Sequence, residues 1–140
     1  MLKRQEITIF NNIKDKVTNM EDYIKFIIPN VYVDEQRGVN LKENGTLDVY
    51  NIYLSIPYTE MYKNIKEYKN LSNLEKQKFF TLEPKKTYII LGNSEINYSD
   101  YETKSEFLDA ITNGRSCLVQ TVDERYHCSK SRWHIEVGAV

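Results

Sequence analysis

The chain has 140 residues, of which 41% are hydrophobic and 28% are charged. A chain of this length is expected to form one domain, residues 1–140, and to bury roughly 70% of its unfolded surface. With 19 basic and 20 acidic residues the net charge is -1, so no overall field favours nucleic acid or anionic lipid. The first residues lack a secretory leader pattern, and no segment approaches the ~20 apolar residues of a membrane span. We therefore expect a soluble protein that is not secreted and has no membrane partner.

Alternating apolar and polar residues predict strands in the first part of the chain. The first covers Glu6–Phe10, and a polar connection follows it to about Glu21. Two further strands are expected over residues 22–28 and 31–36, separated by Pro29-Asn30. Proline cannot donate to a strand ladder, so this junction favours a sheet edge or a bend.

The next predicted strand, residues 46–57, is the longest, and a turn over Asn40–Asn44 precedes it. Asn44-Gly45 suits the positive φ of a hairpin turn. Within the strand the apolar residues change from one side to the other near Val49-Tyr50. We therefore predict a β-bulge at that position, as occurs where sheets curl into barrels.

Strand alternation stops between Tyr58 and Lys86, where the sequence is charged and rich in tyrosine. This excursion from the sheet contains Ser72-Asn73-Leu74-Glu75, a capping box that predicts a short helix from Leu74 to about Phe79. Its lysines and tyrosines could form a nucleic-acid surface. The glutamates between them favour a solvated face of mixed charge instead.

The remaining sequence predicts three strands and one helix. Strands are expected over residues 87–91, 117–124 and 132–137, the last two joined as a hairpin that places the single tryptophan, Trp133, as an anchor. A second capping box at Thr103 begins a helix that Asn113-Gly114 ends. With about seven strands and two short helices in all, the predicted class is mainly β, a small barrel or sandwich of six to eight strands.

One cluster of reactive residue types lies on the terminal hairpin, namely Cys117, Asp123, Glu124, His127, Cys128 and His134. It contains no C-x2-C or H-x3-H pair to chelate zinc and no recognisable arrangement for a nucleophilic cysteine. Free thiols are expected rather than a disulfide. The five glycines never cluster into a phosphate loop. We predict no catalytic residues, no metal and no cofactor.

Three stretches in order along the chain resemble a family of tailed-bacteriophage proteins, the neck proteins of the head-completion or stopper class. The first is Ile7–Asn11, and the second runs from Phe79 to Gly92. The third comprises residues 119–123 followed by 132–138. Relatives often have a Gly-Asp turn where this chain has Lys85-Lys86.

The resemblance implies a non-enzymatic β-barrel subunit of the virion neck, synthesised in the cytoplasm of the host bacterium. Such subunits assemble into a ring, expected to be a hexamer, which closes the DNA channel. The implied partners are portal and adaptor proteins on the head side and the tail terminator or tail tube on the tail side. Packaged DNA is near only because it occupies the lumen. The excursion is our candidate interface, with these residues: Tyr58, Tyr62, Lys63, Lys66, Tyr68 and Lys69.

Three other functions compete with the stopper role. A tail terminator or tail-completion protein would also be a small ring subunit, but it would bind the tail tube. A nucleic-acid-binding barrel would bind as a monomer in a salt-dependent way. An enzyme using Cys117 or Cys128 would lose function when both thiols are alkylated.

Overall fold

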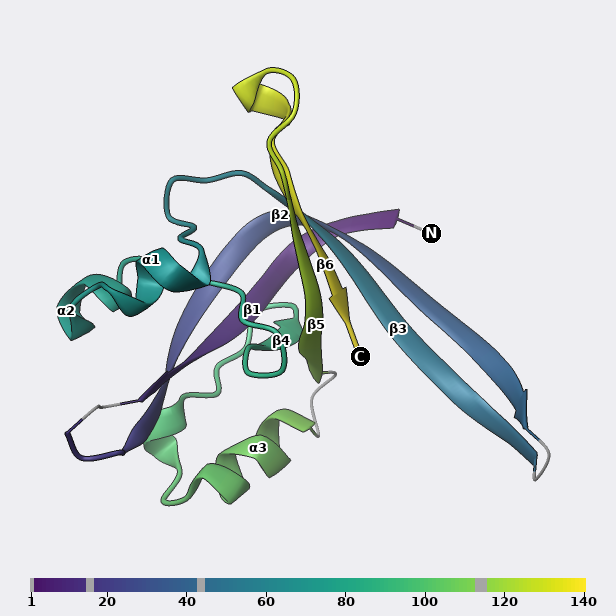
Figure 1. Cartoon of the computed structure of the whole chain (residues 1–140). Helices are drawn as coiled ribbons and strands as arrows, with labels where there is room; N and C mark the ends of the chain where they lie inside the picture. Colours follow the sequence, from purple (N-terminus) through teal and green to yellow (C-terminus); the bar gives the residue numbers. More distant parts are fainter. Residues whose placement is uncertain (1, 15–16, 43–44, 113–115) are drawn as a thin grey trace.

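In the computed structural model, six antiparallel strands form a closed barrel with helices outside it (Figure 1). It describes residues 2–14, 17–42, 45–112 and 116–140, and for residues 2–3, 36–42 and 45–50 the backbone alone. The strands are β1 (Leu2–Lys14), β2 (Glu21–Lys42), β3 (Gly45–Pro57), β4 (Tyr88–Leu91), β5 (Ser116–Arg125) and β6 (His134–Ala139). They follow each other round the barrel as β1-β2-β3-β6-β5-β4, and β4 closes on β1. The predicted mainly β barrel with a few short helices is confirmed.

The interior of the barrel is filled by apolar side chains, as expected for a barrel of this size. Each strand contributes alternate residues, and the excursion adds three more side chains from outside the sheet. The fully enclosed set includes Ile7, Ile9, Val31, Ile52, Ile56, Phe80, Leu82, Ile89, Val119 and Ile135. The strand candidates in the sequence were found from this same alternation.

Residues 21–42 form one strand where we predicted two. Gln5 pairs with Val31 and Ile7 with Ile28, so Pro29 and Asn30 together oppose one residue of β1. This is a β-bulge, and Asn30 adopts a positive φ of 58° within it. The predicted bend is present, but the ladder continues beyond it. β1 also extends to Lys14, through part of the predicted polar connection.

The bulge predicted near Val49-Tyr50 is wrong, because β3 pairs with β2 in unbroken register from Lys42–Gly45 to Tyr32–Ser55. The pairing of β3 with β6 stops at Ile52 and Ala139. Residues 45–51 therefore lie beyond the barrel, so the barrel core does not require one of the two sides of this segment to be apolar. This explains the change of pattern. β2 is the longest strand, and the predicted turn falls partly on residues 43–44, outside the described residues.

The excursion contains two helices, α1 (Ile65–Lys69) and α2 (Asn73–Lys76). The capping box at Ser72 is present, with Glu75 N donating to Ser72 Oγ and Ser72 N to Glu75 Oε1. The helix that it begins is shorter than we predicted, and α1 was not predicted. Asn64 caps α1 through its side-chain oxygen, which accepts from Glu67 N at 2.9 Å.

A second core lies outside the barrel under α3 (Lys104–Thr112). Phe107 and Ile111 pack on Phe10, Tyr23 and Ile90, which point away from the barrel interior. As predicted, Glu106 N donates to Thr103 Oγ1 at 3.2 Å. The predicted stop at residues 113–114 lies outside the described residues. The chain also contains two short 3-10 helices, η1 (Tyr98–Asp100) and η2 (Lys130–Arg132).

The predicted terminal hairpin is present, but Trp133 is not a core residue. β6 begins two residues later than predicted, at His134, and the half-buried Trp133 packs at the tip of the hairpin. Its ring lies 5.3 Å from that of Tyr58 and 5.1 Å from that of Tyr126, between centroids. The tryptophan therefore ties the start of the excursion to the β5–β6 tip.

Candidate interaction surfaces

The excursion is fastened to the barrel at its C-terminal end. Asn11, buried on β1, pairs with the peptide of Thr81: its Nδ2 donates to Thr81 O, and Thr81 N donates to its Oδ1 at 3.2 Å. The neighbouring Phe80 places its ring in the barrel core, 5.6 Å from the Tyr62 ring between centroids, and its backbone forms an isolated parallel bridge with that of Tyr62. The amide of Asn11 thus stands in for a strand partner, and it fixes where the excursion lies.

The six candidate interface residues divide into buried and surface groups. Tyr62 and Tyr68 are buried within the chain, where the hydroxyl of Tyr62 donates to Glu124 Oε1 at 2.9 Å and that of Tyr68 to Lys76 O at 3.3 Å. Burial raises the pKa of Tyr68 to about 12, and burial with the Glu124 hydrogen bond raises the pKa of Tyr62 further. These two tyrosines hold the excursion in place.

The other four candidates remain at the surface. Tyr58 is half-buried in the aromatic cluster at the β5–β6 tip, and Lys63 lies 5.0 Å from the centroid of Phe79. Lys66 and Lys69 are exposed on α1. Of the six, only Tyr68 and Lys69 line the hollow between the excursion and the β1 end of the barrel.

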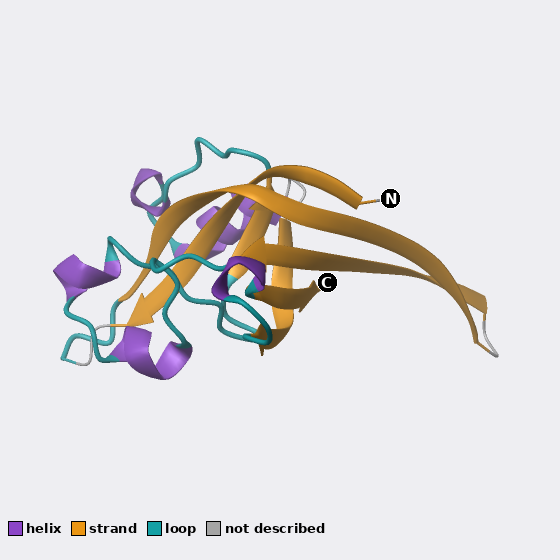
Figure 2. Ribbon diagram, turned by 90° about the horizontal axis from the view of Figure 1, so that it is seen from above, coloured by secondary structure: helices purple, strands orange, loops and turns teal. Residues whose placement is uncertain are grey.

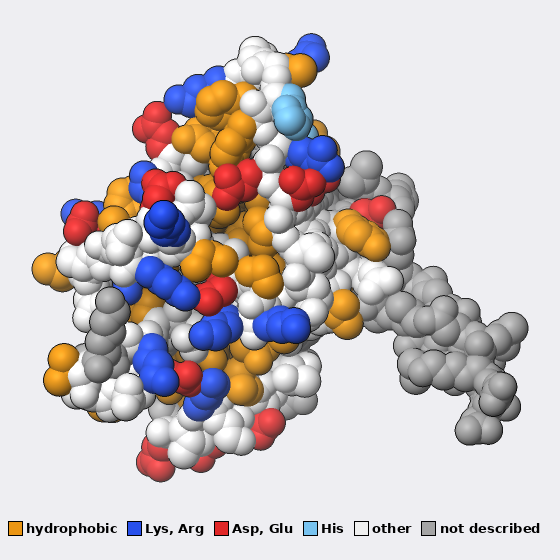
Figure 3. Space-filling model, viewed as in Figure 1, with side chains coloured by type: hydrophobic (Ala, Val, Ile, Leu, Met, Phe, Trp, Pro, Cys, Tyr) orange, Lys and Arg blue, Asp and Glu red, His pale blue; other side chains and the backbone are white. Residues whose placement is uncertain are grey.

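A lysine-lined hollow of about 510 Å³ lies between the excursion and the β1 end of the barrel. Its four lysines come from four segments: Lys14 ends β1, Lys69 ends α1, Lys76 ends α2, and Lys86 precedes β4. Figure 3 shows Lys and Arg side chains gathered on this face, between α1 and α3. The sequence alone does not reveal this site, because these segments meet only in the folded chain.

One carboxylate, Glu83, opposes the four lysines of the hollow. Its Oε1 lies 3.4 Å from Lys69 Nζ and 4.0 Å from Lys86 Nζ, and its side chain is 17% exposed. The turn that presents it is rigid: Glu83 N donates to Thr87 Oγ1 at 2.8 Å, and Lys85 takes a positive φ of 65°. Lysine therefore occupies the left-handed position in this turn without a glycine.

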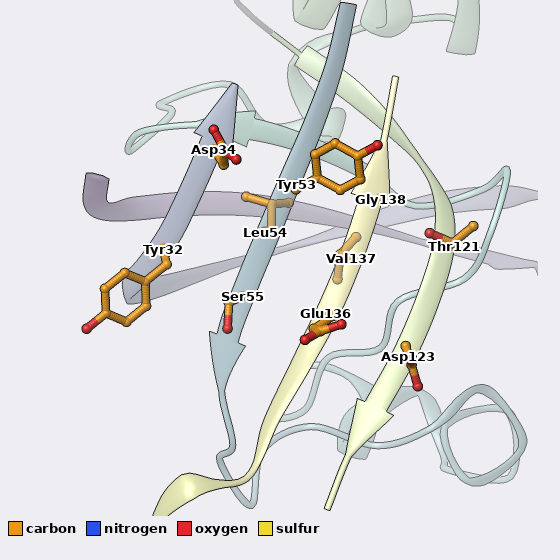
Figure 4. Close-up of a pocket in the computed structure, with 10 residues that line it drawn as sticks. All are labelled: Tyr32, Asp34, Tyr53, Leu54, Ser55, Thr121, Asp123, Glu136, Val137 and Gly138. Atoms are coloured by element: carbon orange, nitrogen blue, oxygen red, sulfur yellow. The ribbon is translucent and has the colours of Figure 1, made fainter. Parts of the chain in front are cut away.

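A second hollow, of about 430 Å³, lies on the outer face of β2, β3, β6 and β5 (Figure 4). Its lining follows two rows across these strands. One row is Tyr32, Ser55, Glu136 and Asp123, and the other is Asp34, Tyr53, Gly138 and Thr121. The missing side chain of Gly138 keeps this part of the hollow open, and there is little room for one: a Cβ at that position would lie 2.5 Å from Thr121 Oγ1. Tyr53, 48% exposed, forms one wall.

The acidic groups of this second hollow already have partners. Arg125 contacts both Asp123, at 2.8 Å, and Glu136, at 3.4 Å. His134 Nε2 lies 3.2 Å from Glu136 Oε1, and this hydrogen bond, with Arg125, lowers the pKa of Glu136. Because the carboxylates of Asp123 and Glu136 are already paired with Arg125 and His134, this face is the weaker candidate site.

A two-stranded arm projects from the barrel on the side opposite α1 and α2 (Figures 1 and 2). We define the arm as residues 36–42 of β2 and 45–51 of β3, which pair with each other from Gln36–Asn51 to Lys42–Gly45. Within the described residues, neither strand of the arm pairs with any other strand. Both of its edges therefore offer free backbone donors and acceptors.

Comparison with known proteins identifies one family. Its model matches residues 2–140, and its description is Family of unknown function (DUF6751). The chain belongs to this family. No protein of curated function and no solved structure matches the DUF6751 chain.

The terminal cluster of reactive residue types is dispersed in the DUF6751 barrel. Cys117 is buried in the barrel core, where burial raises the pKa of its thiol to about 12, while Cys128 is exposed at the β5–β6 tip. Both thiols are free. In the described ranges, no three His, Cys, Asp or Glu side chains are arranged to hold a metal. The helices described are each too short or too polar to cross a bilayer.

Proposed function

We propose that this chain is a structural subunit of the neck of a tailed bacteriophage, acting without catalysis in a ring that joins head to tail. The observation that carries the proposal is the arm. An isolated two-stranded hairpin is marginally stable in water, and a long exposed edge invites pairing with another chain. The barrel does not need the arm, since its closed strand order is complete without residues 36–51. An element of this kind supports a role in contact between molecules.

The partner of the arm in this proposal is the neighbouring copy in the ring. The arm leaves one end of the barrel while the excursion lies at the other end (Figure 2). A contact between the arm of one copy and the excursion end of the next copy would therefore be heterologous. Heterologous contacts close into rings when the rotation between copies allows it. The resemblance to stopper proteins supports the same assembly, with a hexamer as the expected ring.

The location of the protein is tested directly by immunogold electron microscopy. Antibody raised against the purified chain is applied to tailed particles from a culture of the host that carries this gene. Gold at the junction of head and tail is the expected result. Gold confined to the tail tip or capsid, or particles without label whose dissociated proteins still include the chain, would refute the neck assignment.

The role of the arm is tested by replacing residues 37–50 with Asn-Gly. Gln36 pairs directly with Asn51, as Lys42 pairs with Gly45 at the native end of the hairpin. The two positions are six residues apart, an even number, so the Gln36–Asn51 pair has the same place in the hydrogen-bond pattern and a two-residue turn fits there. We expect the variant barrel to unfold at the wild-type temperature or above, because no described core residue is removed. Heads and tails should accumulate separately. Normal joining by the shortened chain would exclude the arm as the ring contact.

A further inference from the structure

We propose that the lysine-lined hollow binds phosphate groups of the DNA backbone. The choice of DNA as the source of phosphate rests on the proposed function, which places the subunit around packaged DNA. The chemistry of the hollow is independent of that function. Its lining carries four ammonium groups against one carboxylate, in a protein whose net charge is only -1. The excess of positive charge is therefore local.

Two of the four lysines form no salt bridge with a described residue. These are Lys14, which lies opposite Glu21 in the β1–β2 ladder and helps to lower the pKa of that carboxyl, and Lys76. Lys69 and Lys86 share Glu83. Lys76 Nζ lies 5.8 Å from the centroid of the Tyr68 ring, which holds its stem against the wall of the hollow. Because ammonium groups held together repel one another, an anion that entered between them would relieve this repulsion.

Neutral donors also line the hollow. Asn12, Asn19 and Asn70, each with a side-chain amide, are among its lining residues. Thr81 forms part of the inner wall, and its buried Oγ1 has no hydrogen-bond partner among the described residues. A phosphate group accepts several hydrogen bonds at once. A site that offers ammonium, amide and hydroxyl donors together therefore fits phosphate better than it fits a carboxylate.

The hollow lacks the features for reading bases. Tyr68, an aromatic ring of the lining, is buried, so its face is not available for stacking. Phosphate contacts alone carry no sequence information. We therefore expect binding that is independent of sequence, no weaker for duplex than for single-stranded DNA, and steeply dependent on salt.

The test is fluorescence anisotropy with the full chain and a labelled DNA duplex, at several salt concentrations. We expect Lys76→Met and Lys14→Met each to raise Kd about fivefold and to reduce the salt slope by about 1. Glu83→Gln should lower Kd, because it removes the competing carboxylate while the backbone of Glu83 keeps the turn. The matched control is Lys78→Met, an exposed lysine two residues from Lys76 that does not line the hollow.

Three outcomes would contradict phosphate binding by the hollow. Equal losses in Lys76→Met and Lys78→Met would mean that general charge, not this site, attracts DNA. Absence of duplex binding by the wild-type chain at low salt would overturn the proposal, as would binding only to phosphatidylserine vesicles. Thermal unfolding of each variant confirms that it is folded.

Head–tail joining separates this proposal from the neck assignment. The chain with the shortened arm should still bind DNA, because the hollow lies at the other end of the barrel. If the lysine variants bind DNA as tightly as the wild type and also join heads to tails normally, phosphate binding by the hollow is refuted while the neck assignment stands.

Discussion

Three buried threonines allow one substitution to be compared at sites whose hydroxyls make different numbers of hydrogen bonds. Thr81, 3% exposed, has an Oγ1 without a partner among the described residues. Thr87, 1% exposed, accepts one hydrogen bond, from Glu83 N at 2.8 Å. Thr8, 0% exposed, makes two: its Oγ1 donates to Gly92 O at 2.8 Å and accepts from Ser94 N at 2.9 Å.

Replacing each threonine with valine exchanges a hydroxyl for a methyl group of similar size. The gain from the added apolar group is common to all three sites, so it cancels in the differences between them. A buried polar group without a partner costs about 1–3 kcal/mol, and a typical hydrogen bond contributes about 1 kcal/mol. We therefore expect Thr81→Val to raise the free energy of unfolding by about 1 kcal/mol.

The other two substitutions should be destabilising, in order. Thr87→Val leaves Glu83 N without its acceptor and should cost about 1 kcal/mol. Thr8→Val removes the hydrogen-bond partner of both Gly92 O and Ser94 N, two groups that hold the segment after β4 against β1. It should cost about 2–3 kcal/mol.

Urea denaturation measures the three free energies, and an unchanged m-value shows that the unfolded reference state is the same in each variant. The reasoning is refuted if the three substitutions have equal effects. It is also refuted if Thr81→Val destabilises the chain as much as Thr87→Val, since the Thr81 hydroxyl would then have a partner such as an ordered water.

Three further outcomes follow from the structure. In the native chain a thiol reagent should modify Cys128 quickly and Cys117 only after unfolding, because Cys117 is buried and its pKa is raised to about 12. Gly138→Ala should lower stability by about 1–2 kcal/mol through the contact with Thr121 Oγ1, and Thr121→Ala should restore most of that loss in a double-mutant cycle. The pKa of Tyr62 is higher in the folded chain than its ordinary value of 10.0. The buried, protonated Tyr62 therefore contributes fully to the stability of the fold below pH 10, and this contribution is lost as the pH rises above 10. Unfolding temperatures measured from pH 8 to 11 should therefore fall less steeply for Tyr62→Phe than for the wild type.

The sequence predicted the elements whose pattern is local. Alternation located β4 to within one residue and β5 to within one residue at each end, and the capping boxes located the starts of α2 and α3 to within one residue. The junction at Pro29-Asn30 was interpreted as a break between strands, because the pattern alone cannot say whether a ladder continues past a bulge. A bulge needs the partner strand to define it.

The candidate sites were harder to predict, since they depend on contacts between distant segments. Tyr62 and Tyr68 were assigned to an interface because the excursion lacks alternation, yet both rings are buried by contacts that only the folded chain makes. The sequence alone offered no reason to single out Lys14, and it marked Lys86 only as a turn residue. Both lie beside Lys76 in the folded chain, where Asn11 holds the excursion against β1. The arm was also missed, since a strand outside the core needs no apolar side.

The paired strands of the arm restrict how its length can change. Side chains alternate between the faces of a ribbon, so one residue added to each strand would exchange the two faces at the tip relative to the barrel. Two residues added to each strand would keep the faces and extend the reach by about 7 Å. Because the barrel closes without the arm, such steps cost the core nothing. In the proposed ring, the spacing between neighbouring copies would therefore change in even increments, independently of the rest of the molecule.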